Sequence, residues 1–185
     1  MRDDAPIVVR RAGPRDAHAI LALGGEVQAL HVAARPDLFR AGGSETPAEI
    51  VARIERPDEA YWVASLGGEV AGFAWAQWQG EPASPLKHAT RTLTLHAIGV
   101  GAAYRGRGIG ERLWEAVREE AARQRVARVI LNVWAFNTGA RAFYERLGFT
   151  PFHTRMAVEM GGGALDSAGA RRDHADAADT PPEPA

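Results

Sequence analysis

The stretch GVGAAYRGRGIGERLW, residues 99–114, sets five glycines directly ahead of a helical pattern. The apolar residues that follow recur at four-residue steps, at Ile109, Leu113, Val117 and Ala121. This spacing predicts an amphipathic helix with one face packed on a sheet. Residues 92–100, TLTLHAIGV, precede the loop and predict a strand. The stretch therefore predicts a strand, a glycine-rich turn and a helix in succession.

Two common phosphate-binding patterns do not fit the glycine spacing. A P-loop requires Lys and then Ser or Thr after its second glycine, and here Arg107 and Gly108 follow Gly106. A dinucleotide-binding G-x-G-x-x-G pattern that begins at Gly99 has Tyr104 in place of its third glycine. That pattern also requires a parallel βαβ unit, whereas the strand before this loop follows a hairpin. Both interpretations therefore fail.

The pattern that remains is R-x-x-G-x-G, formed by Arg105, Gly108 and Gly110. Glycines allow a tight turn that brings successive N–H groups into one concave nest, and the helix adds the positive end of its dipole. Such a nest can bind a diphosphate, and Arg105 and Arg107 can add charge-assisted hydrogen bonds. The alternative is a plain glycine-rich turn between a strand and a helix.

The rest of the chain predicts an alternation of strands and helices. Strands are predicted at 6–11, on both sides of Gly67 and Gly68 within 60–80, at 92–100, at 127–135 and at 150–160. Helices are predicted from Asp16 to Pro36, from Thr46 to about Pro57, after the glycine loop, and from Asn137 to Gly148. Thr46 with Glu49 forms a capping box, and Asn137 is an expected N-cap. The order is β-α-α-β-β-β-α-β-α-β.

Length and charge limit the domain organisation and the partners. The chain has 185 residues, is 46% hydrophobic and carries a formal net charge of −1. This length predicts one domain, which we assign to residues 1–160. Residues 161–185 are rich in Gly, Ala, Pro and Asp and predict a disordered tail. Because no broad basic field exists, we expect neither a nucleic-acid partner nor a membrane partner.

Composition also excludes several kinds of site. The chain has no cysteine, which excludes disulfides, thiolate metal ligands and a cysteine nucleophile. The first ten residues, MRDDAPIVVR, contain acidic residues where a signal peptide would have a basic start. No window approaches 18 consecutive apolar residues. We therefore expect a cytoplasmic protein.

Two segments together resemble the GNAT superfamily of N-acetyltransferases. They are VGAAYRGRGIGERLWEAVREEA, residues 100–121, and VILNVWAFNTGARAFYERLGF, residues 129–149. The resemblance is strong over residues 93–149 and looser upstream. It implies a single α/β (α+β) domain whose mixed central sheet has helices on both faces. It also implies acetyl-CoA as cosubstrate, held without a metal.

The resemblance implies where the cosubstrate binds. The glycine loop would hold the pyrophosphate, and the pantetheine arm would lie like an added strand where two strands part. Gly99 within an apolar run is typical of a bulge or a close backbone approach. The implied cofactor-binding residues are Ile98, Gly99, Val100, Arg105, Gly106, Arg107, Gly108, Ile109, Gly110 and Asn137.

The resemblance also implies two catalytic residues. Tyr144 matches the family tyrosine that donates a proton to the CoA sulfur, and a phenol stays protonated at neutral pH. The alternative is a core tyrosine between Phe143 and Leu147. His96 stands near where many members carry a carboxylate base, and an imidazole suits that role. The alternatives are a structural histidine, with a water chain as base, or a substrate that arrives as a neutral amine.

The junction of the first two helices forms the acceptor wall in this fold, which makes His31 and Phe39 the expected substrate-binding residues. Glu26 and Asp37 are further candidates for that wall, and Trp134 is expected beside the cofactor cleft. The alternative for Phe39 is a core anchor under a loop, and Asp37 is a good turn residue.

The expected function is transfer of an acetyl group from acetyl-CoA to a primary amine of a small molecule, by direct attack in a ternary complex. Alternatives are a noncatalytic acyl-CoA binding or sensing module, and a protein N-terminal or lysine acetyltransferase. A third, an RNA binder that uses YRGRG, residues 104–108, is disfavoured by the near-neutral charge. Relatives of this type imply a homodimer built through the C-terminal strand. The acceptor stays open among polyamines, amino acids, aminoglycosides and protein N-termini.

Overall fold

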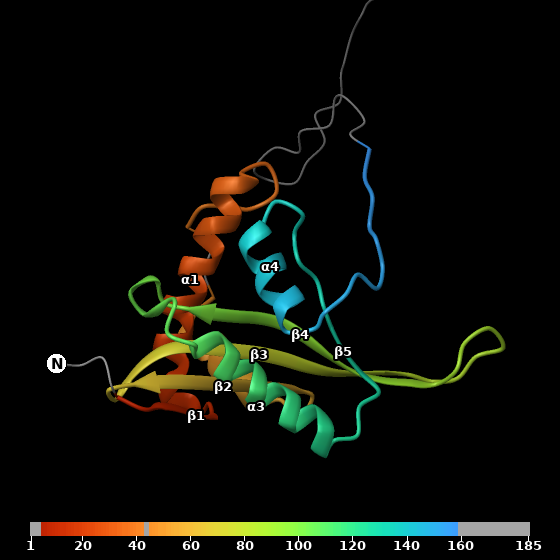
Figure 1. The fold of residues 1–185 in the computed structure, drawn as a ribbon, viewed down its shortest axis with the longest axis horizontal. Helices are drawn as coiled ribbons and strands as arrows, with labels where there is room; N and C mark the ends of the chain where they lie inside the picture. Colours follow the sequence, from red (N-terminus) through yellow and green to blue (C-terminus); the bar gives the residue numbers. More distant parts are fainter. Residues whose placement is uncertain (1–4, 43–44, 159–185) are drawn as a thin grey trace, which may run out of the picture. The chain divides into compact units, whose positions relative to one another are not determined.

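A computed structural model describes residues 5–42 and 45–158 of the chain. Within them a sheet runs in the order β1-β2-β3-β4-β5 (Figure 1). The first four strands pair antiparallel, and β5 pairs parallel to β4. The strands are β1 (Ile7–Arg11), β2 (Glu59–Leu66), β3 (Glu69–Glu81), β4 (Thr90–Val100) and β5 (Arg128–Leu131). The described residues up to Phe149 form one compact unit, and residues 150–158 belong to a second.

Helices cover both faces of the sheet, as predicted. They are α1 (Ala17–Ala34), α2 (Pro47–Ile54), α3 (Ile109–Arg123) and α4 (Thr138–Arg146), with short 3-10 turns η1 (Pro14–Asp16) and η2 (Ala102–Tyr104). One core cluster joins α1 and α2 to the sheet through Ile20, Ile50 and Phe73. The other cluster joins α3 to the opposite face through Leu113 and Val117. The predicted mixed sheet between helical layers is confirmed.

The predicted helix caps and the predicted hairpin turn are present in the structure. In α2 the Thr46 hydroxyl accepts the N–H of Glu49 at 3.3 Å, and the Glu49 carboxylate accepts the N–H of Thr46 at 2.6 Å. In α4 the Asn137 side-chain oxygen accepts the N–H of Ala140 at 3.0 Å. Gly67 and Gly68 both have positive φ, 60° and 88°, which suits the tight turn between β2 and β3. These local predictions are confirmed.

The strands β4 and β5 part soon after they meet, and this divergence positions the site. Their pairing covers only Thr92 to Leu95 of β4 against Arg128 to Leu131 of β5. Beyond Leu95, β4 continues to Val100 and remains paired to β3 on its other edge. The strand predicted at 127–135 is therefore shorter, and the chain turns away after Leu131. We call the opening between the end of β5 and residues 96–100 of β4 the fork.

The strand predicted at 150–160 is wrong over the residues that the structure describes. Residues 150–158 have no regular secondary structure. Alternate apolar residues stabilise a strand only where they are buried, and here Phe152, Met156 and Val158 are 69%, 88% and 79% exposed. The expectation of a homodimer built through this strand loses its basis. The predicted disordered tail, residues 161–185, lies outside the described residues.

Candidate functional site

The fork exposes one edge of β4 to an incoming chain. Within the described structure, β5 provides no ladder partner for β4 beyond Leu95. The predicted cofactor-binding residues Ile98, Gly99 and Val100 lie on this edge. The side chains of Ile98 and Val100 pack against the core cluster that contains α3. A Cβ added at Gly99 would come within 2.4 Å of the Phe73 ring. Gly99 is therefore required for the close approach of Phe73, and an extended ligand can add to the open edge by backbone hydrogen bonds.

Tyr144 brings a hydroxyl from α4 to the fork. Burial raises the pKa of Tyr144 to about 12, while a hydrogen bond with the backbone of Ile98 lowers it by less. The ring packs edge-on against Phe143 and Phe149, with centroids 5.2 and 5.6 Å apart. The side chain thus has the core packing that the sequence offered as one alternative, and its role as a proton donor stays a prediction. Its ring belongs to the core, and its protonated hydroxyl lies beside the Ile98 backbone.

The glycine loop ends at the first turn of α3 with no side-chain cap. Gly106 and Gly108 have φ of 75° and 78°, a conformation that other residues rarely adopt. A Cβ added at either would meet nothing within 4 Å, so the space above the loop is open. Gly108, the N-cap of α3, has no side chain that could accept a hydrogen bond from the first N–H groups of the helix. These donors and the helix dipole fit a diphosphate, which supports the nest predicted from the sequence.

Gly110 has a packing role. A Cβ there would lie 3.0 Å from the ring of Phe143, so the glycine allows α3 and α4 to approach closely. The same contact fixes the loop relative to the helix that carries Tyr144. Asn137, at the start of that helix, uses its side-chain oxygen as the N-cap and retains its NH₂ group as a donor.

Arg105 points back toward the body of the protein. Its Nε donates to the carbonyl of Val100 at 3.2 Å, and its Nη2 lies 3.7 Å from Oε2 of Glu26. Arg107 is exposed beside it on the loop. Glu26, which the sequence suggested for the acceptor wall, instead binds at the base of the glycine loop, where Oε2 accepts the N–H of Ala102 at 2.9 Å.

His96 is the extra residue of a β-bulge. Trp75 pairs with Ala97 and Ala76 pairs with Leu95, which leaves His96 without an opposite residue. Its imidazole stacks on the indole of Trp75, with centroids 4.3 Å apart, and its Nε2 lies 3.3 Å from the side-chain oxygen of Gln77. Desolvation lowers the pKa of His96, partly opposed by the charge of Glu59. The ring is therefore neutral at pH 7 and can accept a proton.

The indole of Trp75, on which His96 stacks, is held by residues that the sequence did not single out. Trp75 donates from Nε1 to Oε2 of Glu59 at 2.8 Å, and the Glu59 side chain is 4% exposed. Tyr61 stacks on Trp75 from the side of β2, with centroids 5.7 Å apart, and the Arg53 guanidinium lies 4.7 Å above the same indole. The register between β2 and β3 places Tyr61 opposite Trp75, and a prediction of these contacts would have required that register.

His31 and Phe39 come together with two aromatic residues of the segment between β5 and α4. His31 stacks on Phe39 at 4.9 Å, and Phe39 packs edge-on against Trp134 at 5.4 Å. Phe136 stacks on Trp134 at 5.8 Å and lies edge-on to His31 at 6.1 Å. We call these four residues the aromatic cluster. Burial lowers the pKa of His31, and Asp37 pairs with Arg35 at 2.8 Å.

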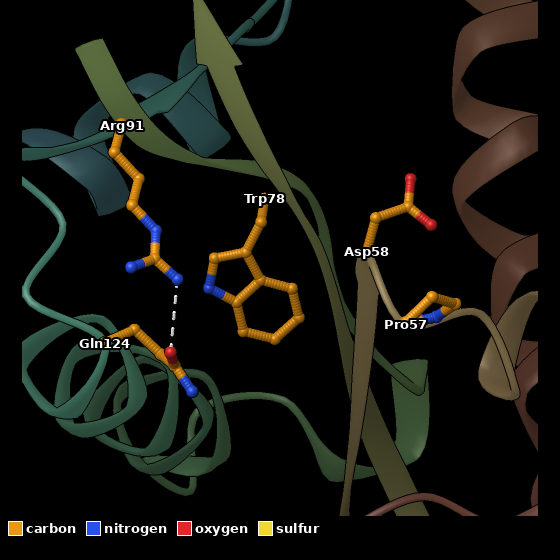
Figure 2. Close-up of a pocket in the computed structure, with 5 residues that line it drawn as sticks. All are labelled: Pro57, Asp58, Trp78, Arg91 and Gln124. Atoms are coloured by element: carbon orange, nitrogen blue, oxygen red, sulfur yellow. Dashed lines mark hydrogen bonds between the residues drawn. The ribbon is translucent and has the colours of Figure 1, made fainter.

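A pocket at the far end of α3 is separate from these residues. Figure 2 shows it, with a volume of about 330 Å³ and a lining of Pro57, Asp58, Trp78, Arg91 and Gln124. Arg91 donates to the side-chain oxygen of Gln124 at 3.3 Å. Gln124 follows the last residue of α3, about 22 Å from the glycine loop at 1.5 Å per residue. None of the predicted site residues lines this pocket.

Among residues 5–42 and 45–158, no group of three or more His, Asp or Glu side chains could hold a metal ion. No helix in the same ranges is long and apolar enough to cross a membrane.

Comparisons with known proteins fit this geometry. The family model described as "Acetyltransferase (GNAT) family" matches residues 27–149. The match includes the fork, the glycine loop, His96 and Tyr144. Mycothiol acetyltransferase of Corynebacterium glutamicum (strain R) is 33% identical over 90 residues, which are 49% of this chain and 28% of that protein. The match therefore covers less than a third of the length of this relative.

Solved structures share the fold. A mutant protein from Bacillus halodurans has a TM-score of 0.80 at 24% identity, over 83% of this chain and 99% of that one. An aminoglycoside acetyltransferase from an uncultured soil metagenomic sample has a TM-score of 0.63 at 18% identity, over 84% and 99% of the two chains. At these identities the likeness concerns the fold alone.

Proposed function

Because the chain belongs to the GNAT family of acetyltransferases, which use acetyl-CoA, we propose that it transfers an acetyl group from acetyl-CoA to a primary amine of a small molecule. The transfer proceeds by direct attack of the amine within a ternary complex. One observation carries this proposal: the protonated Tyr144 hydroxyl lies beside the Ile98 backbone at the fork, on the helix that packs against the uncapped start of α3.

The cosubstrate is held by backbone groups. Residues Ile98 to Val100 bind the pantetheine arm along the open edge of β4, and the NH₂ group of Asn137 contacts the arm from the start of α4. The N–H groups of the loop, from Gly106 to Gly110, bind the diphosphate. Arg107 adds a charge-assisted hydrogen bond to the diphosphate. Arg105 holds the base of the loop through its contacts with Val100 and Glu26. When bound, acetyl-CoA supplies an activated acyl group in a thioester.

Tyr144 donates a hydrogen bond to the CoA sulfur, which is the leaving group of the reaction. In the reaction a C–N bond forms, the C–S bond breaks, the amine loses a proton and the sulfur gains one. A phenol with a pKa of about 12 is a weaker acid than a thiol with a reference pKa of about 8.5. The hydroxyl therefore stabilises the developing negative charge chiefly as a hydrogen-bond donor, and the amine proton balances the sulfur charge at the end.

His96 takes one proton from the incoming ammonium and passes it to solvent, which leaves the neutral amine whose remaining proton goes to the sulfur. The lowered pKa keeps the imidazole neutral at pH 7, and its stacking on Trp75 fixes the plane of the ring. An imidazole that titrates below neutrality is mostly in its basic form at working pH. A water chain replaces it where the acceptor cannot reach the ring directly.

The acceptor is a small amine held against the aromatic cluster. The relative named for mycothiol, 33% identical over 90 residues, supports a small-molecule substrate. His31 and Phe39 contribute the α1 side of this wall, and Trp134 contributes the side next to the fork. Trp134 is 42% exposed, so its indole face is accessible to a substrate. Aromatic faces suit the apolar body of an amine and attract its charged form by cation–π contact.

The test is a turnover screen of the full chain with acetyl-CoA. Polyamines, amino acids, aminoglycosides and peptides with free N-termini are supplied in turn, and both free CoA and the acetylated amine are measured. We expect at least one small amine to be acetylated in proportion to CoA release. Acetylation of peptides alone would replace the small-molecule proposal with a protein acceptor. Binding of acetyl-CoA with no turnover on any amine would point to the noncatalytic module.

A further inference from the structure

Glu26 links the helix on the acceptor side to the loop on the cosubstrate side. It lies in α1, yet its Oε2 accepts the N–H of Ala102 at 2.9 Å. Ala102 is the first residue of η2, the turn through which β4 leads into the glycine loop. The two residues are 76 positions apart in the sequence. The Glu26 side chain of α1 thus bonds the backbone of η2 at the point where the glycine loop begins.

The same carboxylate also faces Arg105. Nη2 of Arg105 lies 3.7 Å from Oε2 of Glu26, and Nε of Arg105 donates to the carbonyl of Val100 at 3.2 Å. Val100 is the last residue of β4 and borders the fork. The contacts therefore run from Glu26 through Arg105 to the end of the strand proposed to bind the pantetheine arm.

Other contacts fix this segment in the same position. A Cβ added at Gly101 would lie 3.1 Å from Leu23, so the turn packs directly on α1. The Tyr104 hydroxyl donates to Oε2 of Glu69 at 2.6 Å. The segment from Gly101 to Arg105 is thus held by α1 and by the start of β3. Its backbone is bonded twice, because the Gly101 N–H donates to the carbonyl of Ala71 at 3.0 Å and the Ala102 N–H donates to Glu26.

The two contacts of Glu26 differ in strength. Its carboxylate is 43% exposed and Arg105 is 53% exposed, and an ion pair at 3.7 Å between exposed side chains contributes little in water. The hydrogen bond from the Ala102 N–H to Oε2 at 2.9 Å has ordinary geometry, and an amide oxygen in the same place can accept it as well. The bond to Ala102 is therefore the stronger of the two contacts that Glu26 makes with the loop.

We propose that Glu26 is a positioning residue for acyl-CoA, which holds the turn at Ala102 so that the N–H groups of the glycine loop converge on the diphosphate. The inference rests on the proposed function. The carboxylate does not touch the diphosphate, and its charge opposes that of the diphosphate. The position of the acceptor oxygen, and not the negative charge, is what the loop requires.

This distinction sets the test. Glu26→Ala removes the acceptor for the Ala102 N–H, and Glu26→Gln keeps an oxygen acceptor while it removes the charge. In calorimetric titrations with acetyl-CoA we expect the Kd of Glu26→Ala to rise by about tenfold and the Kd of Glu26→Gln to stay within about threefold of wild type. Glu55→Ala, which removes an exposed carboxylate after α2, serves as the matched control and leaves the Kd unchanged.

Kinetics and amide exchange separate positioning from general destabilisation. In Glu26→Ala we expect the KM for acetyl-CoA to rise, with kcat at saturation and the KM for the amine unchanged. Exchange of the Ala102 amide hydrogen should quicken at least about tenfold in Glu26→Ala and stay near wild type in Glu26→Gln. Wild-type affinity in Glu26→Ala, or an equal loss in both variants, would overturn the inference. Failure of the wild-type chain to bind acetyl-CoA would overturn the proposed function as well.

Discussion

Tyr144 and His96 have surroundings that shift their pKa values in opposite directions. Burial raises the pKa of Tyr144 to about 12, so the hydroxyl keeps its proton across the physiological range. Desolvation lowers the pKa of His96, so the imidazole is neutral over the same range. One group is thus fixed as a donor and the other as an acceptor. Pairs of groups held in opposite states are typical of acid–base chemistry.

Replacement of Tyr144 by phenylalanine tests the donor. Tyr144→Phe keeps the ring packing on Phe143 and Phe149 and removes only the hydroxyl. We expect kcat to fall by about 100- to 10,000-fold, with the Kd for acetyl-CoA little changed. Tyr104→Phe removes a hydroxyl that bonds Glu69 and should leave kcat within about threefold at saturating acetyl-CoA. A wild-type rate in Tyr144→Phe, with chemistry limiting, would mean that the Tyr144 hydroxyl does not stabilise the leaving sulfur.

The pH profile tests His96. Because its pKa is lowered from the reference value of about 6.5, the basic form should dominate above that pH, and kcat/KM should fall as the pH drops below it. His96→Gln should lose this acidic limb and be slower at pH 8. His31→Gln, which changes a second histidine with a lowered pKa, should keep the limb. An unchanged profile in His96→Gln would mean that water is the base.

At this scale the sequence predicted residues whose role is local. Asn137 was identified as an N-cap because capping depends on residues within one turn. The contact of His96 with Trp75 could not be predicted, because it depends on a bulge that shifts the register between β3 and β4. Glu26 was assigned to the acceptor wall from its place in α1. Its actual partner, Ala102, is far away in the sequence, and only the fold brings the two together.

Among the elements, the glycine loop was the most predictable. Its residues must adopt positive φ, and glycine does so without strain, so the sequence marks the turn directly. The fork was harder to place. The apolar run 127–135 reads as one strand, but β5 ends at Leu131, and Val133 and Trp134 are 36% and 42% exposed. Apolar character alone does not distinguish a buried strand from a segment that supplies exposed aromatic side chains to a site.

The loop conformation can be tested by alanine substitution. Gly108→Ala places a side chain at φ of 78°, so we expect lower stability and a Kd for acetyl-CoA raised at least about tenfold, or about 1.4 kcal/mol. Gly24→Ala is the matched control, since a Cβ there meets nothing within 4 Å inside α1. It should raise stability by about 0.5–1 kcal/mol and leave the Kd unchanged. Equal affinities in the two variants would contradict the nest.

For the whole molecule, the order of elements as far as Gly148 followed from hydrophobic periodicity and turn residues, whereas helices on both faces of the sheet were implied by the resemblance to the GNAT superfamily. The misassigned strand at 150–160 shows the limit of that signal. Alternation indicates that a segment could bury one face, but a strand also needs a partner edge, which lies elsewhere in the chain. The buried residues of the two core clusters lie in α1, α2, α3 and the sheet, and Tyr144 and Phe149 pack against one of the clusters.

This distribution of the core leads to a prediction for residues 161–185. Because their composition is poor in large apolar residues, we propose that they contribute little to stability or to acetyl-CoA affinity. A chain that ends at Met160 should melt within about 3 °C of the full chain, which corresponds to about 1 kcal/mol at this size. Its calorimetric Kd for acetyl-CoA should match that of the full chain. A large loss of either would mean that the segment docks on the domain.

The central claim is that the fork and the glycine loop together form the acyl-CoA site. Amide hydrogen exchange of the full chain, measured residue by residue with and without CoA, tests it most directly. We expect protection at Ile98 to Val100 and at Gly106 to Gly110, with exchange near Trp78, Arg91 and Gln124 unchanged. Protection confined to the pocket of Figure 2, or none at saturating CoA, would contradict the account.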